Sequence, residues 1–184
     1  MTRSLIWSVG IVVTLAAAGW RQTSPGAGPV VVLETARGTV EFETYPEEAP
    51  KTVAAVLALV NQGFYDGQRF HRAEPDFLIQ VGDPASRDTS RREWWGRGGS
   101  GTPIGVAEIT KKRRQLRGAV AMAHTGTDPR TADSQFYILL ADHPDLDARY
   151  AVFGRVISGL DIADRIQVGD VLRKASVRAG SAVP

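Results

Sequence analysis

The feature that most limits the fold of this chain is a series of short apolar segments separated by glycine, proline and aspartate turns. In "VVVLETARGTVEFETY" two such segments, Val30 to Thr35 and Thr39 to Tyr45, flank a turn at Gly38. Polar and apolar side chains alternate along the second, with Val40 and Phe42 on one face, which predicts a half-buried strand. Further strands are expected in "QRFHR", "DFLIQVGD", "GVAEI", "GAVAMAH", "SQFYILL", "YAVFGRV" and "VLRKASVRAG".

Two segments have a helical pattern instead. Apolar residues recur at helical spacing after Pro50, which predicts a helix from Pro50 to Asn61, and "SGLDIADRI" predicts a short second helix. The segment 84–103, "PASRDTSRREWWGRGGSGTP", is expected to be a long surface loop pinned by Trp94 and Trp95. Many short strands with one early and one late helix predict a mainly β fold, a closed antiparallel structure with helices covering its open ends. The pattern alone does not distinguish a barrel from a sandwich.

The length and charge of the chain restrict the classes of function. Its 184 residues suffice for one domain, and 22 basic against 20 acidic side chains give a net charge of +2, which does not indicate a nucleic-acid partner. One basic cluster, Lys111 to Arg114 with Arg117, is either a contact for an acidic surface or a solvated loop.

Several kinds of catalytic site are excluded or unsupported. The chain has no cysteine, which excludes disulfides, thiolate metal sites and a cysteine nucleophile. Its three histidines, His71, His124 and His143, form no close metal-ligand pair, and no nucleotide-binding motif occurs. We therefore expect neither a metal ion nor a cofactor.

The amino-terminal segment predicts export. Residues 1–20 combine a positive start, a short apolar run and the small residues Ala16 to Ala18, which is typical of a signal peptide or a membrane anchor. Residues 21–29 are rich in Gly, Pro, Ser and Thr and predict a flexible linker, so the folded domain is expected over 30–180. The expected location is periplasmic or extracellular, with or without a membrane tether through the leader.

The stretch "FHRAEPDFLIQVGDP" places a permanent cation, Arg72, between an aromatic flank and an apolar strand. Because arginine is charged at any ordinary pH and offers five donors, it requires either a structural partner or a functional role. Glu74 and Asp76 are the carboxylates near enough in sequence to be such a partner.

Five segments together resemble a known family. "GFYDGQRFHR", "PDFLIQVGDP", "GAVAMAH", "DSQFYILL" and "YAVFGRV" look like the signature segments of the cyclophilin-type peptidyl-prolyl cis-trans isomerases, and the resemblance runs from about Val30 to Val177. The resemblance implies a closed eight-stranded antiparallel β-barrel capped by two α-helices, with a substrate groove on an outer face.

The same resemblance implies roles for particular residues. Arg72 matches the catalytic arginine, and Gln80 matches the glutamine that hydrogen-bonds beside it and would hold the guanidinium in place. The residues implied to bind substrate are Phe77, Leu78, Ala123, His124, Gln135, Tyr137, Leu146 and Tyr150. Of these, Ala123 and His124 match positions that contact a peptide through their backbone.

The chain departs from the family at two positions near the implied pocket. Asp145 stands where the family often has a tryptophan, and Tyr150 stands where it often has a histidine. The missing indole removes an apolar wall, which affects the expected sensitivity to cyclosporin-type ligands more than the isomerase activity. Tyr150 keeps an aromatic body with a polar tip and is expected to border the pocket.

The function implied by the resemblance is cis-trans isomerisation of X-Pro peptide bonds in exported proteins, which assists folding. The expected partners are proline-containing peptides and folding protein clients, and the chain is expected to be a monomer. The alternative is a module on the same fold that binds proline segments, as a chaperone does, without catalysis. The pair of Arg72 and Gln80 favours the enzyme, because a binding module does not require it.

Overall fold

A computed structural model describes residues 27–178, which contain eight strands in one antiparallel sheet of order β3-β4-β6-β5-β7-β2-β1-β8. The strands are β1 (Val30–Thr35), β2 (Gly38–Thr44), β3 (Arg72–Glu74), β4 (Leu78–Val81), β5 (Ala119–Met122), β6 (Phe136–Leu139), β7 (Val152–Ser158) and β8 (Leu172–Arg178). The predicted eight-stranded antiparallel sheet is therefore confirmed. The leader, residues 1–20, lies outside the described residues, as does most of the predicted linker.

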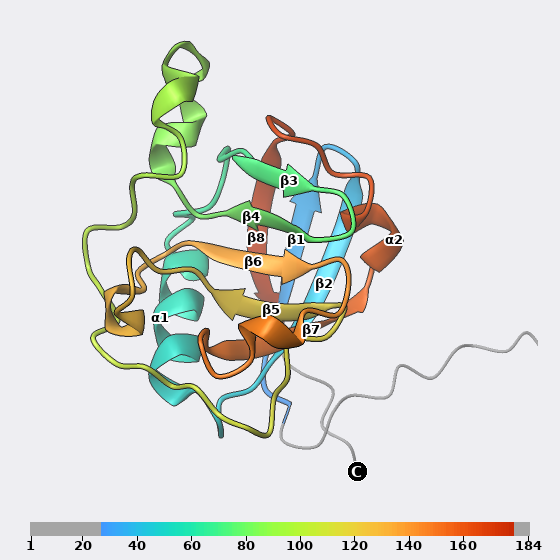
Figure 1. Cartoon of the computed structure of the whole chain (residues 1–184). Coiled ribbons are helices and arrows are strands. Elements are labelled where there is room, and N and C mark those ends of the chain that lie inside the picture. The colour runs from blue at the N-terminus through green and yellow to red at the C-terminus, as the bar shows by residue number, and fades with distance from the viewer. Residues whose placement is uncertain (1–26, 179–184) are drawn as a thin grey trace, which may run out of the picture.

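The sheet curls so that its two edges approach each other. In Figure 1, β3, β4, β6 and β5 lie in front, and β8, β1 and β2 lie behind them. The edges β3 and β8 are joined at one end only, by a bridge between Arg69 and Val171. Beside it, the N–H of Phe70 donates to Asp170 O at 3.0 Å and the N–H of Leu172 donates to Gln68 O at 2.8 Å. The sheet is thus a curled half-barrel, with backbone hydrogen bonds linking its edges beside β3.

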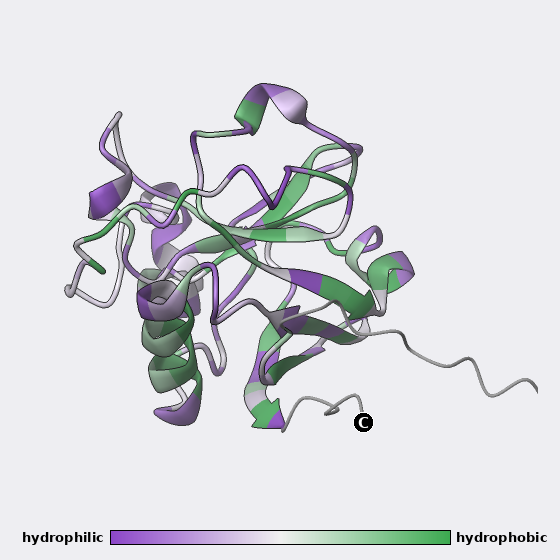
Figure 2. Ribbon diagram, turned by 90° about the horizontal axis from the view of Figure 1, so that it is seen from below, coloured by the Kyte–Doolittle hydropathy of each residue, from purple (hydrophilic) through white to green (hydrophobic). Residues whose placement is uncertain are grey.

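The concave side of the sheet holds the main hydrophobic core. Val40 and Phe42 of β2 are completely buried there, as their alternation predicts. The ring of Phe153 from β7 meets both Phe42 and Phe136 edge-on, and the ring of Phe136 from β6 is tilted against Phe42. Figure 2 shows hydrophobic colouring along the central strands, while the surrounding loops include long hydrophilic stretches. Burial of these apolar side chains is the main driving force for the fold.

Helix α1 (Pro50–Asn61) has the bounds that the sequence predicts. Proline suits its first position because the missing N–H has no partner in a first turn, and Val53, Val56 and Val60 are buried on its inner face. The short helix α2 (Leu160–Ala163) lies on the other side of the molecule (Figure 1). It follows Gly159, whose φ is +78° and where a Cβ atom would lie 2.2 Å from Thr39 O, so only glycine fits.

The strand expected in "GVAEI" is absent, and residues 103–110 have no regular structure. Instead, the carboxylate of Glu108 accepts hydrogen bonds from the N–H groups of Lys51 and Thr52 at 3.0 and 2.8 Å, at the start of α1. These N–H groups have no partner within a helix, so a carboxylate from a distant segment stabilises the helix start.

The predicted loop 84–103 contains two 3₁₀ helices, η1 (Pro84–Arg87) and η2 (Thr89–Trp94). Residues 84–96, here called the arm, project from the body of the molecule (Figure 1). The indole Nε1 of Trp95 donates to Asp88 O at 2.9 Å, so this tryptophan does pin the arm, whereas Trp94 is 48% exposed. Two further turns, η3 (Pro129–Thr131) and η4 (Pro144–Leu146), precede β6 and β7.

Two possible features are not found in the described part of the chain. Between residues 27 and 178 no helix has the length and apolar character needed to cross a bilayer. Across the same residues, no group of three or more His, Asp or Glu side chains is placed to hold a metal ion.

Candidate active site

The hairpin of β3 and β4 places Arg72 directly opposite Gln80 in the strand register. Opposite residues of an antiparallel pair project on the same face, so both side chains emerge on the outer side of the sheet. The Arg72 side chain is 42% exposed, its Nε donates to Glu74 Oε1 at 2.7 Å, and its Cζ lies 5.0 Å from the centre of the Phe77 ring. The guanidinium is therefore held between a carboxylate and an aromatic face.

The ion pair with Glu74 is the structural partner that the sequence suggested for Arg72. Within residues 27–178 it is the one hydrogen bond of this guanidinium, and it occupies Nε alone. Because both side chains are about half exposed, such a pair contributes at most about 1 kcal/mol to stability. The pair orients Arg72 while both terminal nitrogens remain available to a bound molecule.

Nine of the ten residues predicted for the site line one cavity of about 190 Å³, here called the aromatic cavity. The nine are Arg72, Phe77, Leu78, Gln80, Ala123, His124, Tyr137, Leu146 and Tyr150. They come from β3, β4, β6, the end of β5 and the segment that enters β7. The tertiary structure thus brings together side chains that lie as much as 78 positions apart in the sequence, from Arg72 to Tyr150.

The aromatic cavity opens onto a second hydrophobic cluster, on the convex side of the sheet. Leu78, Tyr137 and Leu146 belong to this cluster and are buried, with Phe77 and Tyr150 packed at its edge. The Tyr150 ring stacks on His124 at 4.6 Å and meets Tyr137 edge-on at 5.7 Å. The cavity therefore has an apolar floor and aromatic walls, with Arg72 at its rim.

Of the two departures from the family pattern, one lies in this wall and the other lies outside it. Tyr150 borders the aromatic cavity, as expected for its position. Asp145 does not line the cavity; its side chain is 70% exposed and lies 3.5 Å from Nδ1 of His143. The side chain of His124 also forms part of the wall, and its Nε2 lies 3.2 Å from Arg149 O, whereas the sequence pointed to its backbone alone.

Gln115 supports this wall and was not identified from the sequence. Its side chain is only 1% exposed; Oε1 accepts from the Tyr137 hydroxyl at 3.1 Å, and Nε2 donates to Tyr150 O at 3.3 Å. Its backbone N–H donates to Asp147 Oδ1 at 2.7 Å. One buried amide thus ties the floor of the aromatic cavity to the segment that covers it. In the sequence this glutamine sits within the basic cluster, where nothing distinguishes it from a solvated residue.

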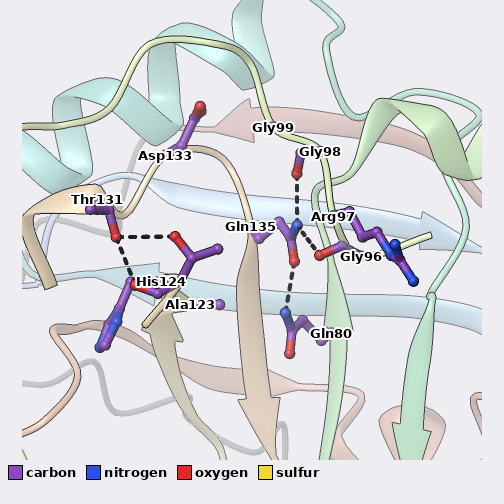
Figure 3. A pocket seen from close by; sticks show the side chains of 11 residues that line it. Gln80, Gly96, Arg97, Gly98, Gly99, Ala123, His124, Thr131, Asp133 and Gln135 are labelled. Atoms are coloured by element: carbon purple, nitrogen blue, oxygen red, sulfur yellow. Dashed lines mark hydrogen bonds between the residues drawn. The ribbon is translucent and has the colours of Figure 1, made fainter. Parts of the chain in front are cut away.

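Gln135, the tenth predicted residue, lines a neighbouring cavity of about 240 Å³, here called the amide cavity. Gln80, Ala123 and His124 border both cavities. Figure 3 shows the Gln80 amide pointing at Gln135, which it reaches with a hydrogen bond of 2.8 Å from Nε2 to Oε1. The structure records no hydrogen bond between Gln80 and Arg72, so the predicted contact is replaced by this amide pair.

The amide pair is anchored by the base of the arm. Nε2 of Gln135 donates to Gly96 O at 2.9 Å and to Gly98 O at 2.7 Å (Figure 3). The carboxylate of Asp83, which is completely buried, accepts from the N–H of Gly96 at 2.6 Å and holds this backbone in place. Both amide groups are therefore oriented by the fold before any ligand binds.

Gly82 explains why β4 can end so close to these groups. Its φ is +119°, and a Cβ atom there would lie 2.4 Å from Ser134 O. Only glycine permits this approach of two backbones, which places Gln80 and Gln135 side by side.

His71 lies beneath the amide cavity and does not line it. Burial lowers the pKa of His71 from its ordinary value, and the nearby Asp83 carboxylate opposes that shift. A Cβ atom on Gly96 would lie 3.0 Å from its imidazole ring, so the histidine fills the space under the arm. It is a packing residue.

The site provides one cation, two oriented amides and an aromatic cavity. Burial raises the pKa of the Tyr137 hydroxyl, so this group stays protonated and serves as a donor to Gln115. Such an arrangement can hold a small apolar ring and direct a charged donor at it. It has no pair of a nucleophile and a base of the kind that bond cleavage requires.

Three comparisons place these features among known proteins. A family model described as "Cyclophilin type peptidyl-prolyl cis-trans isomerase/CLD" matches residues 30–181. Peptidyl-prolyl cis-trans isomerase B of Bacillus subtilis is 41% identical over 138 residues, covering 75% of this chain and 90% of that protein. A probable peptidyl-prolyl cis-trans isomerase of Brucella abortus is 38% identical over 165 residues, covering 85% of this chain and 82% of that protein.

Solved structures show the same fold. The cyclophilin type peptidyl-prolyl cis-trans isomerase of Cryptosporidium parvum superposes with a TM-score of 0.73 at 26% identity, covering 83% of this chain and 99% of that one. A second structure of that protein, determined in the presence of the dipeptide Ala-Pro, gives a TM-score of 0.71 at 26% identity and covers 82% of this chain and 99% of that one.

Proposed function

Since the chain belongs to the cyclophilin-type peptidyl-prolyl cis-trans isomerases, we propose that the aromatic cavity binds the proline ring of its substrate and that Arg72 accelerates rotation about the X-Pro bond. The observation that carries this proposal is the position of Arg72, a cation with two available nitrogens at the rim of an apolar cavity. Support also comes from the relative whose structure was determined in the presence of Ala-Pro.

The chemistry requires only that the twisted amide be favoured over both planar forms. Rotation about an amide has a barrier of about 18–20 kcal/mol, because resonance is lost when the bond twists. In the twisted state the proline nitrogen regains its lone pair and becomes a better hydrogen-bond acceptor. A donor from Arg72 to that nitrogen strengthens in this state specifically, which is the condition for catalysis.

The aromatic cavity holds the ring while the acyl side turns. Leu78, Tyr137 and Leu146 supply the apolar contacts, and Phe77 packs against both the ring site and the guanidinium. Gln115 keeps Tyr137 and Tyr150 in place, so the walls need no rearrangement on binding. A fixed donor in such a site contributes about 10²- to 10³-fold in rate, the size reported for one oriented group.

The amide cavity takes the residues that precede proline. The N–H of Ala123 donates to Gln135 O at 2.9 Å, so contacts with a peptide fall on the carbonyl of Ala123 and on His124. Gln80 and Gln135 act as positioning residues: their hydrogen bond fixes the boundary between the two cavities. The Glu74 contact sets the direction of the guanidinium, which takes over the role that the sequence suggested for Gln80.

The substrates proposed are X-Pro bonds of exported proteins, whose folding the enzyme assists. Support for export comes from residues 1–20, with their positive start and apolar run. The chain then acts as a monomer outside the cytoplasm, either free or held at the membrane by its leader.

Exchange spectroscopy by NMR on an uncharged Ala-Pro peptide tests this function directly. The wild type should increase the cis-trans exchange rate, and Arg72→Ala should lower kcat/KM by about 10²-fold. Arg165→Ala is the matched control, because this arginine is also exposed and paired with one carboxylate, Asp161, outside both cavities. Peptide binding without faster exchange in the wild type would contradict catalysis and favour a binding module. Equal rates for wild type and Arg72→Ala would remove Arg72 from the mechanism.

A further inference from the structure

A third cavity, of about 160 Å³, lies away from the active site and is lined by an unusual set of charges. Its cations are Lys112, Arg113, Arg114, Arg117 and Arg155, and no carboxylate lines it. The remaining lining residues are Tyr45, Leu116, Ala119, Val152 and Gly154. We call this cavity the basic pocket. It contains the basic cluster of the sequence except Lys111, and adds Arg155, which is 38 positions further along the chain than Arg117.

The floor of the basic pocket is the outer face of β5 and β7. Ala119 at the start of β5 lines it, whereas Ala123, just beyond the end of β5, lines the aromatic cavity. Four residues of extended chain correspond to about 13 Å, so the basic pocket and the substrate site occupy opposite ends of one strand. The two cavities share no lining residue, and a ligand in the basic pocket need not contact Arg72.

Three of the five cations form ion pairs with carboxylates that do not line the pocket. Arg114 Nε lies 3.0 Å from Asp147 Oδ2, and Arg117 Nη2 lies 2.7 Å from Asp164 Oδ2. Arg113 Nη2 lies 2.9 Å from Glu48 Oε1, and its Cζ lies 3.6 Å from the centre of the Tyr45 ring. Since Asp147, Asp164 and Glu48 do not line the pocket, they fix these guanidinium groups without filling it.

The other two cations have weaker protein contacts. Among residues 27–178 no hydrogen bond or ion pair is recorded for the ammonium group of Lys112. The Nε of Arg155 lies 3.9 Å from Glu43 Oε1, which is beyond hydrogen-bonding distance, and its side chain is 51% exposed. Both side chains therefore have donors to offer to a bound anion.

A purely structural cluster would distribute its cations differently. Like charges repel, and an arginine that only stabilises the fold is expected to face its carboxylate partner in solvent. Here the cations gather around one concavity that their carboxylate partners do not line. A guanidinium group matches the geometry of a tetrahedral oxyanion, because its planar fork can donate two parallel hydrogen bonds. The fork of Arg117 already donates to Asp164, so Lys112 and Arg155 are the cations with most donors left for an anion.

We propose that the basic pocket binds a phosphate or sulfate group. Its volume of about 160 Å³ is below the range of about 300–1,000 Å³ that is typical of pockets for larger ligands, so it suits a single such group. Leu116 is an apolar lining residue that is 44% exposed. The ligand is therefore expected to carry, next to its oxyanion, an apolar group that packs on this side chain. The ligand class is a phosphate or sulfate monoester with an apolar portion.

Titration of ¹⁵N-labelled protein tests the site, with inorganic phosphate and then phenyl phosphate as probes at constant ionic strength maintained with chloride. The expected result is a saturable shift of the backbone signals of Gly154 and Arg155 with both probes, with tighter binding of the ester. Shifts that do not saturate, or that chloride alone reproduces, would overturn the site. Equal affinity for both probes would overturn the apolar part of the assignment.

A double variant, Lys112→Gln with Arg155→Gln, removes two of the five lining cations and provides the mutational test. Binding of phenyl phosphate should weaken by about tenfold or more, because two of the five cations that line the pocket are lost. Arg165→Gln is the control, since it removes one exposed cation elsewhere on the surface and should leave binding unchanged. The double variant should retain wild-type isomerase activity on an uncharged Ala-Pro peptide, which shows that it is folded. Wild-type affinity in this folded variant would contradict the proposal.

Discussion

The two faces of strands β4, β6 and β5 are both buried, yet they do different things. The concave face contributes Ile79, Val81, Val120, Met122, Phe136 and Ile138 to the main core. The convex face contributes Leu78, Ala119, Ala121, Tyr137 and Leu139 to the second cluster, and Gln80 to the site. Every side chain on the concave face is apolar, whereas the convex face carries a phenol and an amide.

The difference lies in how each face is covered. The concave face is closed by the rest of the sheet and by α1, so it excludes ligands. The convex face is covered by the segment around Leu146 and Tyr150, which Gln115 holds through its side chain, and this cover leaves an opening. The same strands therefore stabilise the fold with one face and line the proposed substrate site with the other.

The largest expected effect is on the concave face. Phe136 is 1% exposed, and its ring meets Phe42, Tyr65 and Phe153 at 5.8, 5.4 and 6.1 Å. Phe136→Ala should lower the free energy of unfolding by about 3–5 kcal/mol, as measured by urea denaturation. The neighbouring change Tyr137→Phe, on the convex face, should cost about 1 kcal/mol. A larger loss in Tyr137→Phe than in Phe136→Ala would reverse the assigned roles.

A smaller effect is expected at Gln115, which hydrogen-bonds to Tyr137 and Tyr150 on the convex face. Gln115→Leu leaves the buried Tyr137 hydroxyl without its acceptor and should destabilise the protein by about 1–3 kcal/mol. It should also raise KM for an Ala-Pro peptide more than it lowers kcat, because the walls loosen while Arg72 stays in place. Gln62→Leu, at an exposed position after α1, is the control and should change neither parameter. If Gln115→Leu changed stability without affecting KM, Gln115 would have no part in shaping the site.

The third prediction concerns pH and the packing beneath the amide cavity. Burial lowers the pKa of His71 in the folded state, so the unfolded state binds a proton more readily. Stability should therefore fall as the pH decreases through about 6.5, the ordinary value for histidine. His71→Asn should flatten this dependence, as measured by thermal unfolding between pH 5 and 8. The Asp83 carboxylate opposes this shift in pKa. If His71→Asn and the wild type showed the same pH dependence of stability, the carboxylate would cancel the effect of burial and the prediction would be wrong.

The smallest effect is expected at the rim of the site. Glu74→Gln removes an ion pair between two half-exposed side chains and should change the free energy of unfolding by less than about 1 kcal/mol. Isomerase activity should be largely retained, because the neutral amide can still accept from Nε of Arg72. A loss of activity as large as that of Arg72→Ala would show that the carboxylate itself takes part in the reaction.

Some elements could be predicted because their pattern is local. The alternation in β2 predicted the burial of Val40 and Phe42, although it did not predict that Glu43 is buried as well, and the spacing of Val53, Val56 and Val60 predicted α1. In β5 and β6 all four residues are buried, so no alternation shows which face is which. The segment "GVAEI" was misassigned because an apolar pattern does not reveal that its glutamate binds the start of a helix.

By itself, the sequence determined the class of fold, the main helix and most of the residues that line the candidate site, because turn chemistry, periodicity and the family's motifs all lie in short segments. Only the tertiary structure decided which side chains are partners. Gln80 hydrogen-bonds to Gln135, which is 55 positions away, and Gln115 accepts a hydrogen bond from Tyr137 in the wall of the aromatic cavity, which no pattern near Gln115 predicts. It also decided that Arg155 joins the basic cluster in one pocket. Such contacts depend on the register between strands that are remote in the chain, and register is set by how the whole sheet packs.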